Sequence, residues 1–263
     1  MRTISLPKKI EFIKGTDSNQ KRAIIEPCYP GYGTTIGNSL RRVLLSSLSG
    51  AAVVGVKIKG ADHEFMALPH IKEDVLEIIL NLKQLRLKMF TEEIVKLDLV
   101  VRGEKKVIAA NINKNSQVEI VNPDLVLAHI TDMAGVMEME IFVAQGRGYV
   151  TIESRENKAR ETGYIEMDSV FTPVLSVGII VENVRVGKMT NWDKLILDIA
   201  TDGTITPEEA FDRAAKILIE QFTALTSDSQ TAVKEESVEK TIIPDVVSDE
   251  EVKPKKRGRP KKS

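Results

Sequence analysis

The chain has 263 residues, of which 42% are hydrophobic and 29% are charged, a balance typical of globular proteins. No apolar run approaches the roughly 18 residues that a membrane-spanning helix needs, which excludes a protein with such helices. The single cysteine, Cys28, excludes an internal disulfide framework. The first residues lack the apolar core of a signal peptide, so we expect a protein of the reducing cytoplasm.

The formal net charge of −1 conceals an uneven distribution along the chain. Residues 1–225 carry 28 basic and 30 acidic side chains, residues 226–252 carry 2 and 8, and residues 253–263 carry 7 and 0. Apolar periodicity also stops after Leu225. We therefore expect a nearly neutral folded body, followed by a disordered tail that is first acidic and then basic.

The first expected helix spans residues 37–49. Its apolar residues recur at helical spacing, and they are Ile36, Leu40, Val43, Leu44 and Leu48. Gly50 follows, where a left-handed residue commonly ends a helix. The glycines from Gly31 to Gly37 lack the spacing of a dinucleotide fingerprint, and no Gly-Lys-Ser/Thr follows them. They indicate a tight turn entering the helix rather than a phosphate loop.

The middle of the chain is expected to hold one more helix and mainly strands. The helix spans residues 72–84, with Val75, Ile78, Ile79 and Leu82 on one face and acidic residues in its first turn. Alternation of apolar and polar residues, as in 54–59 and 137–141, is typical of a sheet with one face in water. The expected strands are 53–59, 96–102, 117–121, 136–144, 176–186 and 194–200.

The last expected helix has the clearest signals. Thr206 supplies a capping hydroxyl, Pro207 occupies the first helical position, and Glu209 completes a capping box. Apolar residues then recur on one face: Ala210, Phe211, Ala214, Leu218, Phe222 and Leu225. Antiparallel sheets combined with a few helices predict an α+β fold.

The residues indicate no catalytic centre, no metal site and no cofactor. His63, His70 and His129 have no second ligand at metal spacing, and one cysteine cannot form a Cys/His zinc pattern. No pair of carboxylates stands in an apolar context that would indicate acid/base catalysis. The motif Gly146-Arg-Gly-Tyr149 indicates a glycine-flanked turn or bulge after a strand. We therefore do not expect an enzyme that acts alone.

Two arginines, Arg41 and Arg42, interrupt the apolar segment of the first helix. One interpretation is that both extend from a core helix into solvent. In the other, the helix has two functional faces: an apolar face around Leu44 for core or dimer packing, and a face with Arg42 and Leu45 for a partner. The spacing alone fits both interpretations.

Four blocks of this sequence resemble the α subunit of bacterial-type DNA-dependent RNA polymerase, in its amino-terminal assembly domain. They read GTTIGNSLRRVLLSS at 33–47, KEDVLEIILNLK at 72–83, GRGY at 146–149 and TDGTITPEEA at 201–210. The blocks occur in the order expected for that family. The resemblance therefore covers about residues 1–226.

The resemblance implies a discontinuous dimerisation domain of residues 1–52 and 172–226, built from a sheet and two amphipathic helices. Residues 53–171 would form a mainly β inserted domain that contacts large subunits. Residues 227–252 would be an acidic disordered linker, and 253–263 a basic tail. The usual family member continues into a small folded domain that binds promoter DNA, and nothing after Leu225 has the apolar content to build it.

The resemblance also implies a homodimer that serves as the non-catalytic assembly platform for the β and β′ subunits. The complete enzyme would add ω and a sigma factor, and the catalytic carboxylates and magnesium would belong to a large subunit. By motif position, Arg41, Arg42, Leu45 and Lys83 would contact large subunits. The dimer interface would consist of apolar residues from the first and last helices: Leu40, Val43, Leu44, Leu48, Phe211, Leu218, Phe222 and Leu225. We expect Phe222 to be buried.

The basic end resembles the AT-hook through Arg257, Gly258, Arg259 and Pro260. A glycine between two arginines lets the backbone lie deep in a narrow A·T-rich minor groove. The alternative is a merely basic end that binds phosphates without sequence preference or aids solubility. So short a motif fits both interpretations.

Three classes of function follow from these observations. We expect the assembly subunit of a DNA-dependent RNA polymerase, acting in transcription. The alternative is a free-standing DNA-binding or architectural protein that uses its basic tail, which predicts duplex binding without polymerase subunits. The nearly neutral body argues against that alternative. A self-sufficient enzyme would require a catalytic set of residues that the sequence does not offer.

Overall fold

The computed structural model describes residues 4–155 and 163–226. The acidic stretch and the AT-hook-like residues expected beyond 226 lie outside the described residues. Of the described residues, those at 4–155 and 163–219 belong to one compact unit, and the end of the final helix, from 220 onward, belongs to a second. All the strand pairs in the described ranges are antiparallel, so the α+β prediction is confirmed.

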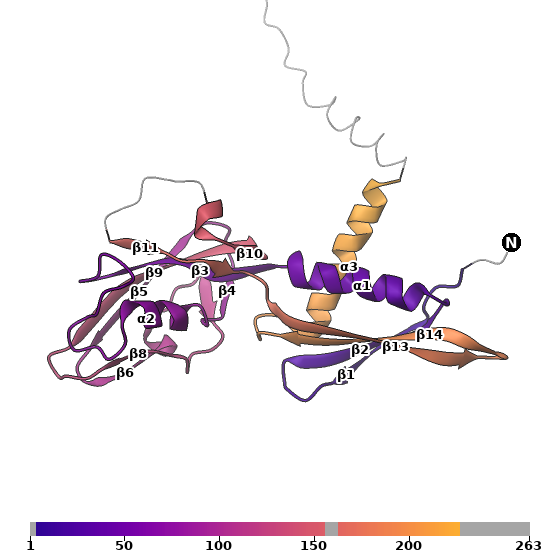
Figure 1. Cartoon of the computed structure of the whole chain (residues 1–263), viewed down its shortest axis with the longest axis horizontal. Helices are drawn as coiled ribbons and strands as arrows, with labels where there is room; N and C mark the ends of the chain where they lie inside the picture. The colour runs from indigo at the N-terminus through magenta and orange to yellow at the C-terminus, as the bar shows by residue number, and fades with distance from the viewer. Residues whose placement is uncertain (1–3, 156–162, 227–263) are drawn as a thin grey trace, which may run out of the picture. The chain divides into compact units, whose positions relative to one another are not determined.

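A four-stranded sheet forms one part of the first unit (Figure 1). Its strands, in spatial order, are β1 (Lys9–Lys14), β2 (Gln20–Cys28), β14 (Met189–Thr201) and β13 (Val174–Val186). Helix α1 (Tyr32–Ser46) packs on β13 and β14. Helix α3 (Pro207–Ala224) contributes Phe211 to the core. Its ring packs edge to face on that of Phe12, with 5.7 Å between the ring centroids. These elements enclose one hydrophobic core.

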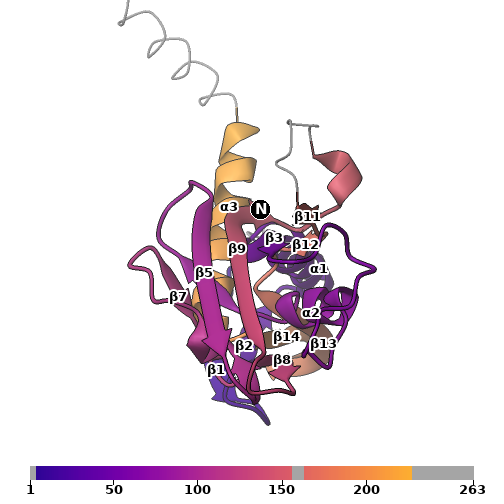
Figure 2. The ribbon, with the colours of Figure 1, turned by 90° about the vertical axis from the view of Figure 1, so that its left-hand side faces the viewer.

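A larger sheet lies in the middle of the chain. Its strands, in spatial order, are β5 (Val95–Arg102), β9 (Val136–Arg147), β3 (Ser49–Ile58), β4 (Leu87–Met89) and β7 (Val118–Ile120), and β11 (Tyr164–Glu166) also pairs with β3. Figure 2 shows β5 beside β9, with which it pairs along its whole length. Two ribbons complete the fold: β6 (Lys105–Ile108) with β8 (Val126–Ile130), and β10 (Tyr149–Val150) with β12 (Ser169–Val170). Two 3-10 turns, η1 (Ala109–Asn111) and η2 (Ile152–Ser154), lie between strands.

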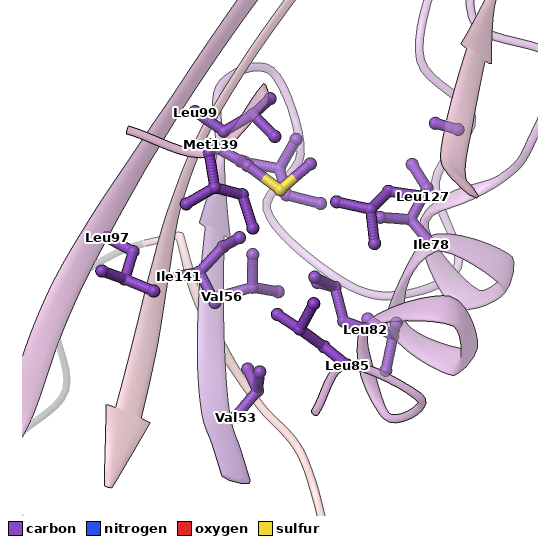
Figure 3. Packing of buried hydrophobic residues seen from close by; sticks show 14 of the residues in the cluster. Val53, Val56, Ile78, Leu82, Leu85, Leu97, Leu99, Leu127, Met139 and Ile141 are labelled. Carbon is purple, nitrogen blue, oxygen red and sulfur yellow. The ribbon is translucent and has the colours of Figure 1, made fainter. Parts of the chain in front are cut away.

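Helix α2 (Val75–Leu82) closes the core of the larger sheet. Its buried residues Ile78 and Leu82 point towards strand residues such as Ile141 (Figure 3). The Asp74 carboxylate caps the helix by accepting the backbone N–H of Glu77 at 2.7 Å. The apolar stripe predicted for 72–84 is thus confirmed, and the helix is shorter because Asp74 begins it later in the sequence.

The predicted start and end of the first helix were wrong. The helix begins at Tyr32, after Gly31 in the left-handed region at φ 86°, and it ends at Ser46. Gly50 does not end the helix; it pairs with Gly146 inside the larger sheet. The helix begins early because the buried carboxylate of Asp193, on β14, accepts the backbone N–H groups of Gly31 and Gly33 at 2.9 and 3.0 Å.

The strand predictions were correct in place and incomplete in number. All six expected segments are strands, with ends that differ by a few residues. The alternation predicted a wet face for 54–59, and this was wrong at its start, because β3 is central and Val54, Gly55 and Val56 are all buried. Val54 lies in a third, small cluster with Phe171, on the face opposite Val56. In contrast, β5 alternates strictly between buried and exposed residues.

Candidate subunit-binding surfaces

The apolar residues of α1 and the turn after it divide by burial. Leu40, Leu44 and Leu48 are 4%, 0% and 2% exposed and belong to the core of the four-stranded sheet. Val43 and Leu45 are half-buried and pack against the same core. The first three side chains are therefore covered by the chain itself. Part of the side-chain surface of Val43 and Leu45 stays exposed.

Arg41 and Arg42 are exposed on α1. Neither guanidinium has a hydrogen bond or an ion pair with another residue in the described ranges. The backbone of this helix end is held from outside the helix, because the Thr172 hydroxyl donates to the carbonyl of Leu45 at 3.2 Å. The two guanidinium groups thus lie near a fixed helix end, and their N–H donors are available to another molecule.

Helix α3 carries its predicted apolar face from the core outwards. Phe211 is 9% exposed and Leu218 half-buried, whereas Ile219, Phe222 and Leu225 are 63%, 61% and 81% exposed. The expectation that Phe222 is buried was wrong for the single chain. The reason is that an apolar stripe requires a cover without specifying which molecule supplies it. Ile219 and Phe222 are three residues apart and so lie on neighbouring positions of one side of the helix, and Leu225 follows directly after its end.

Lys83, at the end of α2, lies beside an acidic residue that the sequence did not single out. Its Nζ is 3.9 Å from Oδ2 of Asp168, and these side chains are 37% and 32% exposed. The other oxygen of Asp168, Oδ1, accepts the backbone N–H of Ile152 at 2.9 Å. This backbone hydrogen bond is the main cause that lowers the pKa of Asp168, and hydrogen bonding from Tyr149 and the charges of Lys83 and Arg155 add to it.

Tyr149, the last residue of the GRGY block, belongs to the same group of side chains. Its ring is 61% exposed and lies opposite Val170 in the β10–β12 ribbon. Partial burial raises the pKa of the Tyr149 phenol, and its hydrogen bond to the Asp168 carboxylate raises the pKa further. Lys83 and Tyr149 come from two separate family-like blocks, and Asp168 lies in neither of them.

The glycines of the GRGY block are explained by one aromatic side chain. A Cβ at Gly146 would lie 2.7 Å from the ring of Phe171, and a Cβ on its strand partner Gly50 would overlap the carbonyl oxygen of Phe171. Gly148 adopts φ 64° and its carbonyl accepts the N–H of Phe171 at 2.8 Å. The expected glycine-flanked turn is therefore confirmed, and it seats Phe171 against the sheet.

Two of the three histidines pair with carboxylates. Nδ1 of His129 lies 2.5 Å from Oε1 of Glu73, and Nδ1 of His70 lies 3.3 Å from Oδ2 of Asp132. The described residues contain no group of three side chains that would hold a metal ion. Among them, no helix is long and apolar enough to cross a membrane.

Sequence reasoning missed Asp168 and Asp193, which organise these surfaces. Both act on segments far away in the chain, so no local spacing indicates them. For Asp193 a signal existed, because it interrupts the inward-facing apolar positions of its strand, which continue at Leu195, Leu197 and Ile199. A carboxylate on a buried face requires a partner.

Comparison with known proteins identifies related chains. Residues 56–172 match the model of the RNA polymerase Rpb3/RpoA insert domain. Proteins named DNA-directed RNA polymerase subunit alpha are similar to this chain in Carboxydothermus hydrogenoformans (50% identity, 76% of this chain and 64% of the relative), Oceanobacillus iheyensis (48%, 80% and 67%) and Desulfovibrio desulfuricans (50%, 76% and 57%).

The chain thus spans about 57–67% of the length of these relatives. The match of residues 56–172 falls on the larger sheet with α2, and the relatives cover most of the remaining described residues as well. At 48% identity over 212 residues, the likeness extends far beyond the four short blocks. The chain belongs to the family of DNA-directed RNA polymerase α subunits.

Proposed function

We propose that this chain is a non-catalytic subunit of a DNA-directed RNA polymerase and acts as a homodimer on which the β and β′ subunits assemble. The observation that carries the proposal is the exposure of apolar residues at the end of α3, Ile219 and Phe222, and of Leu225 directly after it. A regular apolar stripe exposed to water is a common sign of a protein interface. Because α1 and α3 each leave apolar surface uncovered, a second copy can cover both in a two-fold arrangement.

The proposed domain division is residues 1–52 with 172–226 for dimerisation and 53–171 for the inserted domain. Two separate hydrophobic cores support it. One draws its buried residues from between Ala23 and Leu48 and between Val174 and Ala214. The other draws them from between Val53 and Met167. The match of 56–172 to an insert domain supports the same boundaries.

The burial of each candidate in the single chain limits which residues could contact a second copy directly. Four of the candidates would support the interface from beneath, because they are buried in the chain's own core: Leu40, Leu44, Leu48 and Phe211. Val43, Leu218, Phe222 and Leu225 would make the direct contacts. Large-subunit contacts are proposed for Arg41, Arg42, Leu45 and Lys83, and the unpaired guanidinium groups on α1 favour an acidic or carbonyl-rich partner surface.

The native mass of the full chain, alone and after mixing with the β subunit, tests this proposal. We expect a dimer that takes up one β subunit. A monomer that ignores β would refute the platform. Duplex binding by that monomer would favour the alternative of a free-standing DNA-binding protein, which the names of the relatives do not support.

Substitution of Arg42 separates assembly from folding. Arg42→Ala should leave a folded dimer that recruits the large subunit poorly, because an exposed arginine contributes to a partner interface more than to the core. Arg102→Ala, an exposed arginine on β5, is the matched control and should change neither property. Loss of the dimer in Arg42→Ala would contradict the assignment of this residue to the large-subunit surface.

We also propose that the basic end binds A·T-rich duplex DNA through Arg257, Gly258, Arg259 and Pro260. The sequence of these residues supports this proposal. The double substitution Arg257→Ala with Arg259→Ala should abolish a preference for A·T-rich over G·C-rich duplex in a binding titration at fixed salt. An unchanged preference would reject the AT-hook interpretation.

A further inference from the structure

We propose that Asp168 is a positioning residue that joins Lys83 and Tyr149 into one composite contact for a large subunit. The inference rests on the proposed function, because it concerns the surface to which Lys83 was assigned. It adds Tyr149 as a direct contact and Asp168 as the residue that sets the geometry of that contact.

Asp168 and the segment that carries it contact three separate parts of the chain. Oδ2 faces Nζ of Lys83 at the end of α2, and Oδ1 accepts the N–H of Ile152 at the start of η2. The segment that carries Asp168 also pairs with β10, where Tyr149 lies opposite Val170, and the negative charge of the carboxylate helps to raise the pKa of the Tyr149 phenol. One side chain thus lies between a cation and the strand pair that carries an exposed aromatic ring, although Lys83 and Tyr149 are far apart in the sequence.

The backbone that carries Asp168 is itself anchored to the central strand. The neighbouring Ser169 is 2% exposed, and its hydroxyl donates to the carbonyl of Val53 at 2.6 Å. The guanidinium of Arg155 donates to the carbonyl of Val54 and to Oγ of Ser169, both at 2.8 Å. Because this segment is tied to β3 by side-chain hydrogen bonds, Asp168 is held in place before any partner binds. Such prior ordering lowers the entropy cost of association.

The chemistry of this proposed contact indicates which kind of partner surface would bind it. Tyr149 and Val170 lie opposite each other in register and are 61% and 51% exposed, so they offer an apolar centre. An ammonium has three donors, and Asp168 faces only one side of that of Lys83. The partner segment is therefore expected to place an apolar side chain on Tyr149 and Val170, with a carboxylate or backbone carbonyl beside Lys83.

A double-mutant cycle on the full chain tests the inference. Asp168→Asn keeps an oxygen acceptor for the Ile152 N–H and removes the charge that faces Lys83. We expect Asp168→Asn and Lys83→Ala each to weaken binding of the large subunit about tenfold, and the double variant to be little weaker than either single variant. The reason is that a positioning residue acts through the group it positions. Asp98→Asn, which breaks another exposed aspartate–lysine pair, is the matched control and should leave binding unchanged.

A second readout is independent of the large subunit. Titration of the Tyr149 phenol, followed by NMR and assigned with Tyr149→Phe, should give a lower pKa in Asp168→Asn than in the original chain, because the neighbouring negative charge is gone. Equal melting temperatures for both chains would show that folding is intact.

The outcomes distinguish this inference from the proposed function. If the original chain binds no large subunit, the proposed function falls and the inference falls with it. If it binds, but the two substitutions weaken binding independently or the Tyr149 pKa does not change, the inference alone is overturned. Non-additive losses together with a lowered phenol pKa support it.

Discussion

The two cores of the first unit differ in how completely a single chain buries them. The core of the larger sheet is built from one continuous stretch, and its exposed apolar residues are spread over loops, helix α2 and strands, as at Phe65, Leu80 and Val100. The core of the four-stranded sheet is built from two distant stretches. One of its helices, α3, exposes Ile219 and Phe222 near its end. The first core, that of the larger sheet, is thus closed within one chain, whereas the end of α3 is the part that the proposed second copy would cover.

The largest expected effect tests the completeness of the first core. Leu82→Ala should lower the free energy of unfolding by about 2–5 kcal/mol, because Leu82 is 0% exposed and its removal leaves a cavity. Leu80→Ala in the same helix is the matched control, since Leu80 is 50% exposed and should cost under about 1 kcal/mol. Urea unfolding of both variants gives the comparison. Equal losses would mean that α2 does not close this core.

The next effect concerns the proposed contact between two copies of the chain. Phe222→Ala should weaken the dimer by about 2–4 kcal/mol, seen as a raised dissociation constant in sedimentation or mass photometry. A folded monomer should survive, because the ring is 61% exposed in the single chain. Phe65→Ala, at 77% exposure on a loop before α2, removes a similar ring and should leave the dimer unchanged. A dimer that tolerates the loss of Phe222 would contradict the proposed role of the stripe.

A smaller effect tests the junction at which β3 and β9 hold Phe171. Gly50→Ala should destabilise the chain by about 1–3 kcal/mol, because its Cβ would overlap the backbone carbonyl of Phe171, which cannot move without the segment between β12 and β13. Gly178→Ala is the control, since the nearest atom to its Cβ would be at 3.4 Å. A thermal melt of the two variants measures the difference. Similar melting temperatures would show that the segment around Phe171 yields easily.

The smallest effect is a pH dependence confined to the first core. Burial alone would raise the pKa of Glu73, but hydrogen bonds from the ring and backbone N–H of His129 outweigh burial and lower it. A carboxyl whose pKa is lower when folded stabilises the fold above its unfolded pKa, and this stabilisation is lost as the pH falls through the folded pKa.

Glu73→Gln should therefore be less stable than the original chain at about pH 6, and the difference should shrink below the ordinary value of 4.5. Urea unfolding across this range measures it. Glu92→Gln, an exposed carboxylate in the loop between β4 and β5, is the control. A difference that stays constant with pH would show that the Glu73–His129 pair does not act through charge.

Local signals in the sequence were sufficient for some elements. The capping box at Thr206 forms as predicted, since the N–H of Glu209 donates to the Thr206 hydroxyl at 3.2 Å and the Glu209 carboxylate accepts the N–H of Thr206 at 3.4 Å. Strict alternation also predicted β5 correctly. Both patterns are set by neighbours within a few residues, so the sequence contains all that is needed to recognise them.

Other features depend on contacts that spacing cannot reveal. The strands β10, β11 and β12 have two or three residues each and carry no period of their own. The candidate site divides in the same way. Lys83 was proposed from its position in a block, but its neighbour Asp168 lies far along the chain, between β11 and β12, and was not. The exposure of Phe222 could not be predicted, because periodicity reports an apolar face and not its cover.

The cap of α1 has a consequence for the order in which the chain can fold during its synthesis. The carboxylate that accepts the N–H groups of Gly31 and Gly33 belongs to Asp193, so the beginning of this helix depends on a strand made much later. The residues of the larger sheet and α2 are all translated before that strand. While the ribosome is still at work, the middle of the protein can therefore reach its final packing, and the earlier residues must wait for β14 to emerge.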